Sequence, residues 1–123
     1  MFEYTEAFSG FSVSDTQQAK KFYAETMGVP VTEEYGLLTL ELAGGRNTLI
    51  YPKDDHTPAS YTTLNFKVDD IDAAVDELAS QGVTFLRYEG MDQDAKGIHR
   101  GGGPFIAWFT DPAGNILSVL QDR

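Results

Sequence analysis

The stretch that decides the fold is residues 108–115, which read Trp-Phe-Thr-Asp-Pro-Ala-Gly-Asn. It begins inside an apolar run, residues 105–109, and a second apolar run, residues 116–121, follows it. Between the runs stand Asp, Pro, Gly and Asn, which favour tight turns because Pro presets φ, Gly accepts positive φ, and Asp and Asn side chains bond to nearby backbone. The stretch therefore predicts two strands joined by a turn at residues 111–115.

A faint internal repeat extends this pattern to the rest of the chain. Residues 8–15 and 63–70 both alternate apolar with polar side chains, which is typical of half-buried strands. In both segments the alternation ends at an Asp, Asp15 in the first and Asp70 in the second. A carboxylate there can accept from the free N–H groups of a helix and suits the helix dipole. We expect a helix to begin after each Asp.

Apolar residues follow each Asp at helical spacing, so each helix should bury one stripe in the core. The stripes are Ala19, Phe22, Tyr23 and Met27 in the first helix, and Ile71, Ala74, Val75, Leu78 and Ala79 in the second. Gly28 and Gly82 come where a helix end favours a left-handed residue. Both helices are expected to end there.

Strand-like sequence follows each helix. The expected strands are residues 31–35, 37–43 and 48–51 in the first half, with a turn at 44–45, and residues 83–88, 105–109 and 116–121 in the second. The fold class is thus α+β, with two βαβββ modules at about residues 6–52 and 61–121. Residues 53–60 are too few for a flexible tether, so we expect one domain over residues 1–123.

Composition narrows the function. The 123 residues include no cysteine, which excludes disulfides, zinc-thiolate sites and cysteine nucleophiles. Nine basic residues against nineteen acidic ones give a formal charge of −10, which opposes binding to nucleic acid and to anionic membranes. No apolar run is long enough to span a bilayer, and the N-terminal residues lack the features of a signal peptide. We expect a cytoplasmic protein whose charge serves solubility or attracts a cationic ligand.

The repeat, the Asp-capped helices and the Phe-x-Asp-Pro-x-Gly-Asn signature at residues 109–115 together resemble the vicinal oxygen chelate superfamily. This group includes glyoxalase I, extradiol dioxygenases and bleomycin-resistance proteins. The resemblance implies two modules that form a curved mixed sheet around a cavity, with helices on the outer face. It also implies a homodimer with a small molecule as partner.

Enzymes of that superfamily hold a divalent metal ion with one residue from each of four strands. The resemblance places these positions at Phe8, Thr63 and Ser118, and near Thr48 or Ile50. Phenyl, hydroxyl and aliphatic groups cannot supply the carboxylate and imidazole donors that such an ion needs. We therefore expect neither a metal site nor a cofactor.

Strand alternation predicts which residues face the cavity. Our ligand-binding candidates are Phe8, Tyr51, Thr63, Asn65, Trp108 and Ser118. Two alternatives stay open for Trp108, which can pack in the core or form an aromatic wall. Lys67 faces the same side as Asn65 and either bonds a ligand or points to solvent.

Catalytic residues cannot be assigned from the sequence, but three candidates lie in loops. His56 and His99 can act as general acid or base if their loops cover the cavity, because imidazole titrates near neutrality. Arg100 can pair with an anionic group of a ligand. Residues 90–104 are rich in glycine and form either a lid or a mobile surface loop.

Three functions follow from these observations. The first is metal-independent binding of a small molecule, with sequestration or resistance as its purpose. The second is a lyase, isomerase or dioxygenase of the glyoxalase kind, with a shifted metal site built from His56, His99 and Glu41 or with metal-free acid–base residues. The third is an interaction module. The sequence shows no basic patch and no amphipathic run that would support this third function.

Overall fold

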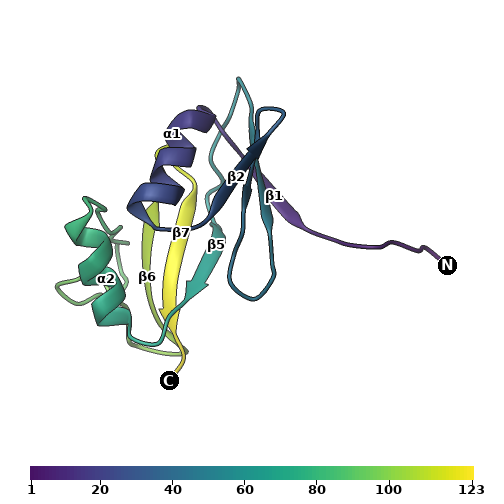
Figure 1. Ribbon diagram of the computed structural model, residues 1–123. Helices are drawn as coiled ribbons and strands as arrows, with labels where there is room; N and C mark the ends of the chain where they lie inside the picture. Colours follow the sequence, from purple (N-terminus) through teal and green to yellow (C-terminus); the bar gives the residue numbers. More distant parts are fainter. The chain divides into compact units, whose positions relative to one another are not determined.

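A computed structural model describes residues 1–123, and these form two compact units, residues 1–56 and residues 57–123. The boundary falls inside residues 53–60, the expected connection between the two modules. Each unit holds one sheet and one helical segment, which can be followed along the chain in Figure 1. No helix is both long and apolar enough to cross a membrane.

The first unit is a four-stranded mixed sheet. β1 pairs in parallel with β4, and the other pairs are antiparallel, which gives the order β1-β4-β3-β2. Leu38, Leu40 and Ile50 are fully buried on the side where the helix lies against β3 and β4. The strands are β1 (Ser9–Val13), β2 (Val31–Glu34), β3 (Leu37–Leu40) and β4 (Thr48–Pro52).

The helix of the first unit begins as predicted and ends in a way the sequence did not predict. The Asp15 carboxylate accepts from Gln17 N–H and Gln18 N–H at the start of α1 (Thr16–Lys21). The helix then widens into a π-helical segment, η1 (Phe22–Thr26), in which Met27 N–H bonds the Phe22 carbonyl at 3.0 Å. Such widening inserts one residue into the helical turn. The expected left-handed glycine then follows, with a φ of 73° at position 28.

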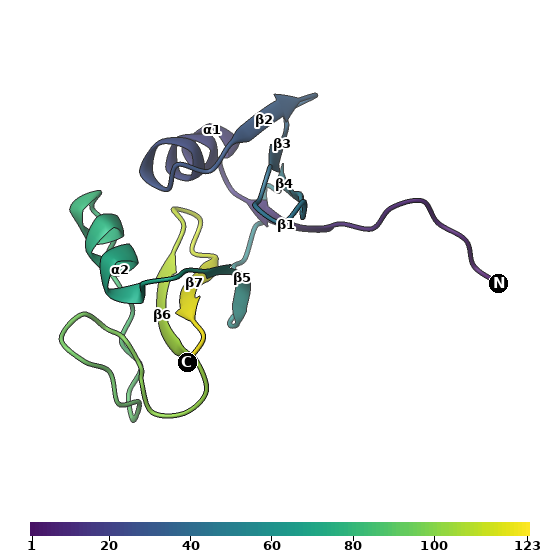
Figure 2. The same cartoon turned by 60° about the horizontal axis from the view of Figure 1, so that its bottom comes forward.

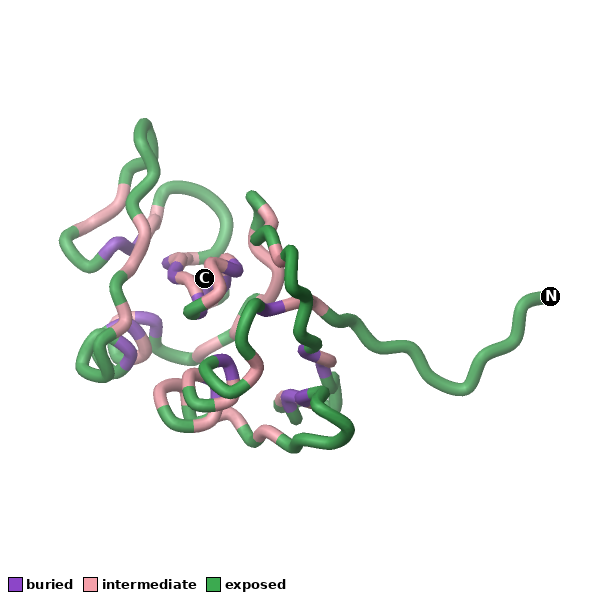
Figure 3. The backbone as a smooth tube through the Cα atoms, turned by 90° about the horizontal axis from the view of Figure 1, so that it is seen from above, coloured by how far each residue is buried: buried purple, intermediate pink, exposed green.

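Residues 1–7 lead away from β1 as an extended arm (Figure 2). All of them are exposed, as the green N-terminal segment of Figure 3 shows. The rings of Phe2 and Tyr4 stack on each other with centroids 5.4 Å apart. The end of this arm reaches the pocket described below.

The second unit is a three-stranded sheet in the order β5-β7-β6, with β5 parallel and β6 antiparallel to the central strand. The helix α2 (Ile71–Ser80) lies against β6 and β7, and the Asp70 carboxylate accepts from Ala73 N–H at its start. Ile71, Val75 and Leu78 form its buried stripe, as the spacing predicted, whereas Ala74 is only half-buried and Ala79, expected in the same stripe, is exposed. The strands are β5 (Thr62–Lys67), β6 (Phe105–Thr110) and β7 (Ile116–Gln121).

The predicted strand at residues 83–88 was wrong. Only Phe85 pairs with the sheet, through an isolated bridge to Phe109, and Leu86 N–H bonds the Trp108 carbonyl at 2.8 Å. Tyr88 N–H instead bonds the side chain of Gln93 at 2.8 Å. A side chain thus supplies the hydrogen-bond partner that a neighbouring strand would otherwise provide for the backbone. The pairing with β6 ends at this point. The second module is a βαβββ unit whose second strand is reduced to a bridge.

The turn at residues 111–115 forms as predicted. The Asp111 carboxylate accepts from Ala113 N–H, Asn115 N–H and the Asn115 side-chain amide, all at 2.9–3.0 Å. Asp111 and Asn115 are nearly inaccessible to solvent. A buried carboxylate needs such donors to offset its desolvation. The signature residues thus have a structural role, which is to close the β6–β7 hairpin.

Candidate functional site

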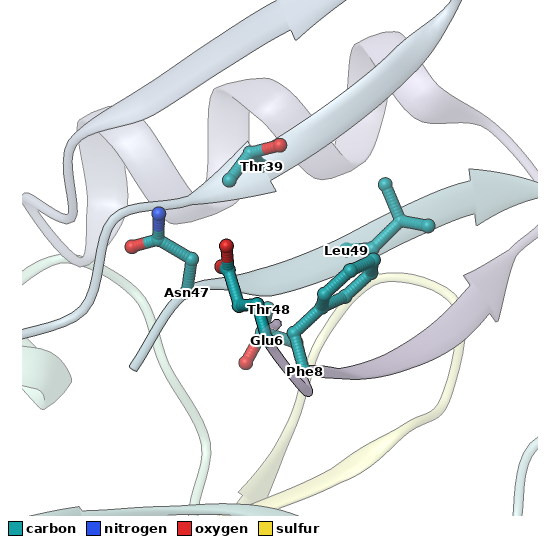
Figure 4. A pocket seen from close by; sticks show the side chains of 6 residues that line it. All are labelled: Glu6, Phe8, Thr39, Asn47, Thr48 and Leu49. Carbon is teal, nitrogen blue, oxygen red and sulfur yellow. The ribbon is translucent and has the colours of Figure 1, made fainter. Parts of the chain in front are cut away.

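The first unit has a pocket of about 220 Å³ on the sheet face opposite the helix. The face carries the row Gly10, Leu49 and Thr39, which are paired across β1, β4 and β3. Figure 4 shows the Phe8 ring beside Leu49 in the pocket, with Asn47 and Thr39 toward its other side. The lining residues are Glu6, Phe8, Thr39, Asn47, Thr48 and Leu49.

The polar side chains of this pocket are not used by the protein itself. Glu6, Thr39 and Asn47 make no side-chain hydrogen bond and no ion pair within the chain. Glu6 is the only charged residue of the lining. Unused donors and acceptors beside an aromatic and an aliphatic wall are typical of small-molecule sites. This pocket is our candidate binding site in the first unit.

Two of the predicted ligand-binding residues lie in the first unit, and only one lines the pocket. Phe8 is 65% exposed and forms the aromatic wall. Tyr51 is half exposed and pairs with Ser12 across the β1–β4 ladder, one step further along the sheet than the pocket residues. The structure therefore brings Phe8 together with residues that the sequence analysis did not single out, namely Glu6, Thr39 and Asn47.

The second unit brings together three predicted ligand-binding residues on the face opposite α2. Trp108 pairs with Ser118 across β6 and β7, and Ser118 pairs with Asn65 across β7 and β5. The Ser118 hydroxyl donates to the Asn65 side-chain oxygen at 2.6 Å. This bond leaves the Asn65 amide NH₂ free to donate elsewhere. Ser118 itself is fully buried, so it orients Asn65 rather than offering a surface.

An aromatic pair borders this row. The Tyr88 ring meets the Trp108 ring edge-on, with centroids 5.3 Å apart. Burial raises the pKa of the Tyr88 hydroxyl above its ordinary value. Such T-shaped pairs are favourable and hold both rings in place. Trp108 thus serves as a fixed aromatic surface in the same cross-strand row as Asn65.

Thr63 lies at an irregularity in β5. The register between β5 and β7 shifts between Thr62 and Leu64, which makes Thr63 the extra residue of a β-bulge. Its hydroxyl donates to the Ile116 carbonyl at 3.2 Å. The simple alternation that placed Thr63 beside Asn65 therefore does not hold here, because a bulge interrupts the pattern.

Both histidines are held by hydrogen bonds near their own loops. The His56 ring and the Ser12 hydroxyl are joined at 2.6 Å, which fixes the end of the first unit to β1. The His99 ring bonds the Asp92 carbonyl at 2.8 Å, within the glycine-rich segment. Neither histidine lines the pocket of the first unit. Within each unit, nothing brings a histidine together with further potential metal ligands.

Arg100 is held by two carboxylates. Its guanidinium donates two hydrogen bonds to Asp72, at 2.9 and 3.0 Å, and one to Asp94 at 3.2 Å. The hydrogen bond from Arg100 is the main cause that lowers the pKa of Asp72. Burial acts to raise the pKa of Asp94, but bonds from Ile98 N–H, Arg100 and Lys96 N–H together hold it below its ordinary value. Arg100 therefore holds the loop to α2, and its guanidinium is already paired with carboxylates of the protein rather than with an anionic ligand.

The four positions that the superfamily uses for metal do not fit a metal ion here. Phe8 offers only a ring, and the hydroxyls of Thr63 and Ser118 already donate to neighbours within the sheet. Thr48 and Ile50 are both buried in the first unit and carry no carboxylate. No group of three His, Asp or Glu side chains gathers into a cation site. The donor set therefore does not match the divalent ion that the fold family implies.

Two repeated βαβββ units, each with its helix on one face and polar and aromatic side chains on the other, define a two-module α+β protein of the glyoxalase type. The chain belongs to the Glyoxalase/Bleomycin resistance protein/Dioxygenase superfamily, whose family model matches residues 8–119. This confirms both the resemblance and the fold class. No curated protein matched the sequence.

Solved structures with this fold come from several bacteria. The glyoxalase family protein from Enterococcus faecalis is 26% identical, covers 98% of this chain and 99% of its own, and has a TM-score of 0.69. TnmS3, an antibiotic binding protein from Streptomyces sp. CB03234, is 24% identical, with coverage of 99% and 100% and a TM-score of 0.69. The fosfomycin resistance protein FosX from Listeria monocytogenes is 13% identical, with coverage of 99% and 96% and a TM-score of 0.72.

Proposed function

We propose that this protein binds a small organic molecule without a metal ion, and that it acts by sequestering the molecule or conferring resistance to it. The observation that carries the proposal is the pairing of aromatic walls with unused polar groups on the sheet faces opposite the helices. Phe8 lines one pocket together with Glu6 and Asn47 in the first unit. In the second unit, Trp108 and Asn65 lie in one cross-strand row, on either side of Ser118. Catalysis has less support, because Arg100 is neutralised by carboxylates and neither histidine lines the described pocket.

Membership in a superfamily with antibiotic-binding and resistance proteins is consistent with this role. Sequestration needs only affinity, so the absence of suitable metal donors does not impair it. A homodimer and a cytoplasmic location remain predictions from the sequence and the family. Light scattering on the purified protein tests the first of them.

Trp108 is the only tryptophan, so its fluorescence reports directly on the row in the second unit. We expect at least one compound from a broad set of aromatic organic molecules to change this emission saturably, with the same affinity in the presence of a chelator. Replacing Asn65 with Ala removes the free amide donor and should weaken binding of that compound about tenfold, the value of one good hydrogen bond.

Gln81→Ala is the matched control, because it removes an exposed amide at the end of α2, away from the sheet. It should leave the affinity unchanged. If no compound changes the emission or the melting temperature, or if binding requires a divalent ion, the proposed function is wrong.

A further inference from the structure

The pocket of the first unit has the chemistry of a cation site. We propose that it binds the primary ammonium group of a small organic amine, with Glu6, Asn47 and Thr39 as acceptors and Phe8 and Leu49 around the adjoining apolar part. This inference rests on the proposed binding function and names the class of ligand that one part of the protein takes.

The charge of the lining selects the sign of the ligand. Glu6 is the only ionised side chain that lines the pocket, and no lysine, arginine or histidine pairs with it. An anionic ligand would meet this carboxylate without a compensating positive group. The formal charge of −10 acts in the same direction over longer distances, since it raises the local concentration of cations.

The number of free acceptors suits an ammonium group. A primary ammonium has three N–H donors and no acceptor. The pocket offers the Glu6 carboxylate, the Asn47 side-chain carbonyl and the Thr39 hydroxyl, none of which has a partner within the chain. Bonds to an ionised group are about twice as strong as neutral ones. The number of acceptors that line the pocket thus matches the number of ammonium donors.

The apolar part of the lining indicates what is attached to the amine. The Phe8 ring and the Leu49 side chain lie next to each other in the pocket (Figure 4). An aromatic face attracts a nearby cation and also packs against methylene groups. The volume of about 220 Å³ is below the roughly 300–1,000 Å³ of sites that enclose a whole drug-sized ligand. The pocket thus holds one amine-bearing end of a ligand.

The probe for this inference is phenethylamine, whose ammonium is separated from an aromatic ring by two methylenes. 2-Phenylethanol has nearly the same shape without the charge, and 3-phenylpropionate carries the opposite charge. The full chain labelled with ¹⁵N allows the Asn47 side-chain amide and the Thr39 and Leu49 backbone amides to be followed by NMR. We expect phenethylamine to shift these signals saturably, with a dissociation constant on the order of 1 mM, and the other two probes to shift them much less.

Two variants separate the carboxylate from general effects of charge. Glu6→Gln should weaken phenethylamine binding about tenfold, because it removes the ionised acceptor. Glu3→Gln makes the same change in net charge three positions earlier in the exposed arm, outside the pocket, and should have less than about a twofold effect. Raising the salt to about 1 M, where the Debye length is about 3 Å, should weaken binding of the amine.

Equal binding of phenethylamine and 2-phenylethanol, equal effects of the two variants, or no shift at all would overturn the ammonium site. A different compound that quenches Trp108 without moving the Asn47 signal would overturn this site alone, and the proposed function would stand. Failure of every compound in both assays would overturn both.

Discussion

At the scale of single residues, the buried carboxylate of Asp111 shows how one side chain shapes a turn. It accepts three hydrogen bonds from residues 113–115 and is almost fully removed from solvent. Hydrogen bonds to a charged group contribute more than neutral ones, and losing the acceptor leaves buried donors unsatisfied. The β6–β7 hairpin therefore depends on this one group.

Asp111→Ala should lower the free energy of unfolding by about 2–4 kcal/mol, because it leaves the Ala113 and Asn115 donors without an acceptor. Asp111→Asn keeps one acceptor oxygen and should fall between Ala and the wild type. Urea denaturation measures both. Asp54→Ala, at an exposed aspartate of the first unit, should cost less than about 0.5 kcal/mol. A loss below about 1 kcal/mol for Asp111→Ala would show that the turn does not need its carboxylate.

Sequence patterns predicted the role of single residues where a suitable side chain stands at a recognisable boundary between two elements. Asp15 and Asp70 cap their helices because each combines a short carboxylate with a strand-to-helix corner. Glu6 and Asn47 were missed because neither belongs to a strand or helix pattern: Glu6 precedes β1, and Asn47 ends the loop before β4. Only Thr39 had a usable signal, since it alternates with the buried Leu38 and Leu40.

At the scale of elements, the glycine-rich segment 90–104 is an ordered loop held to α2. Asp94 N–H donates to the Ile98 carbonyl, Ile98 N–H donates to the Asp94 carboxylate, and Ile98 is buried. Arg100 bridges this loop to Asp72 in the first turn of α2. The guanidinium also lies over the Phe105 ring, 5.1 Å from its centroid. The structure thus supports an ordered loop that Arg100 holds to α2.

The attachment of this loop to α2 should weaken in acid. The pKa values of Asp72 and Asp94 are lowered in the folded protein, so each contributes stability that is full above its unfolded pKa and is lost as pH falls through the folded value. Hydrogen exchange of Ile98 N–H should therefore accelerate below about pH 4, after correction for the intrinsic exchange rate. It should be unaffected between pH 6 and 8, a range in which neither carboxylate titrates.

Arg100→Gln should produce a similar acceleration already at neutral pH and should flatten the acid dependence. Arg46→Gln is the control, because Arg46 makes no ion pair within the chain and carries the same charge. Equal exchange rates in these two variants would mean that the loop is held by something other than the Arg100 contacts.

Element-level predictions succeeded for the seven strands of the two sheets and failed at residues 83–88. The segment 83–88 has the composition of a strand, but Gln93 supplies the bond that Tyr88 would have made in a ladder. The bulge at Thr63 is invisible to an alternation rule, because the extra residue leaves the apolar pattern intact on both sides. The π-helical turn at Phe22–Thr26 likewise leaves no mark in the spacing of the apolar residues.

At the scale of the whole molecule, the side chains at the four superfamily positions predict that stability does not depend on a metal ion. The superfamily positions carry Phe, Thr and Ser, and no His, Asp and Glu cluster replaces them within either unit. We therefore expect the melting temperature to be the same with and without EDTA, and unchanged by Mn²⁺, Zn²⁺ or Ni²⁺. A site filled at 100 times its dissociation constant would add about 2.7 kcal/mol, a shift of several degrees. A rise of that size with one ion, reversed by EDTA, would contradict the assignment.

Each unit is closed by a parallel pair between its first and last strands, β1 with β4 and β5 with β7. This has a consequence for the order of events on the ribosome, where a chain emerges at about 5–20 residues per second. The first unit can complete its sheet once Pro52 has emerged. In the second unit, β5 and β6 each find their partner strand only in Ile116–Gln121, so the sheet cannot assemble until this last strand has been made. Until then the apolar face of α2 has no sheet to pack against. We therefore expect the second unit to be the part of the nascent chain that is more accessible to chaperones and proteases.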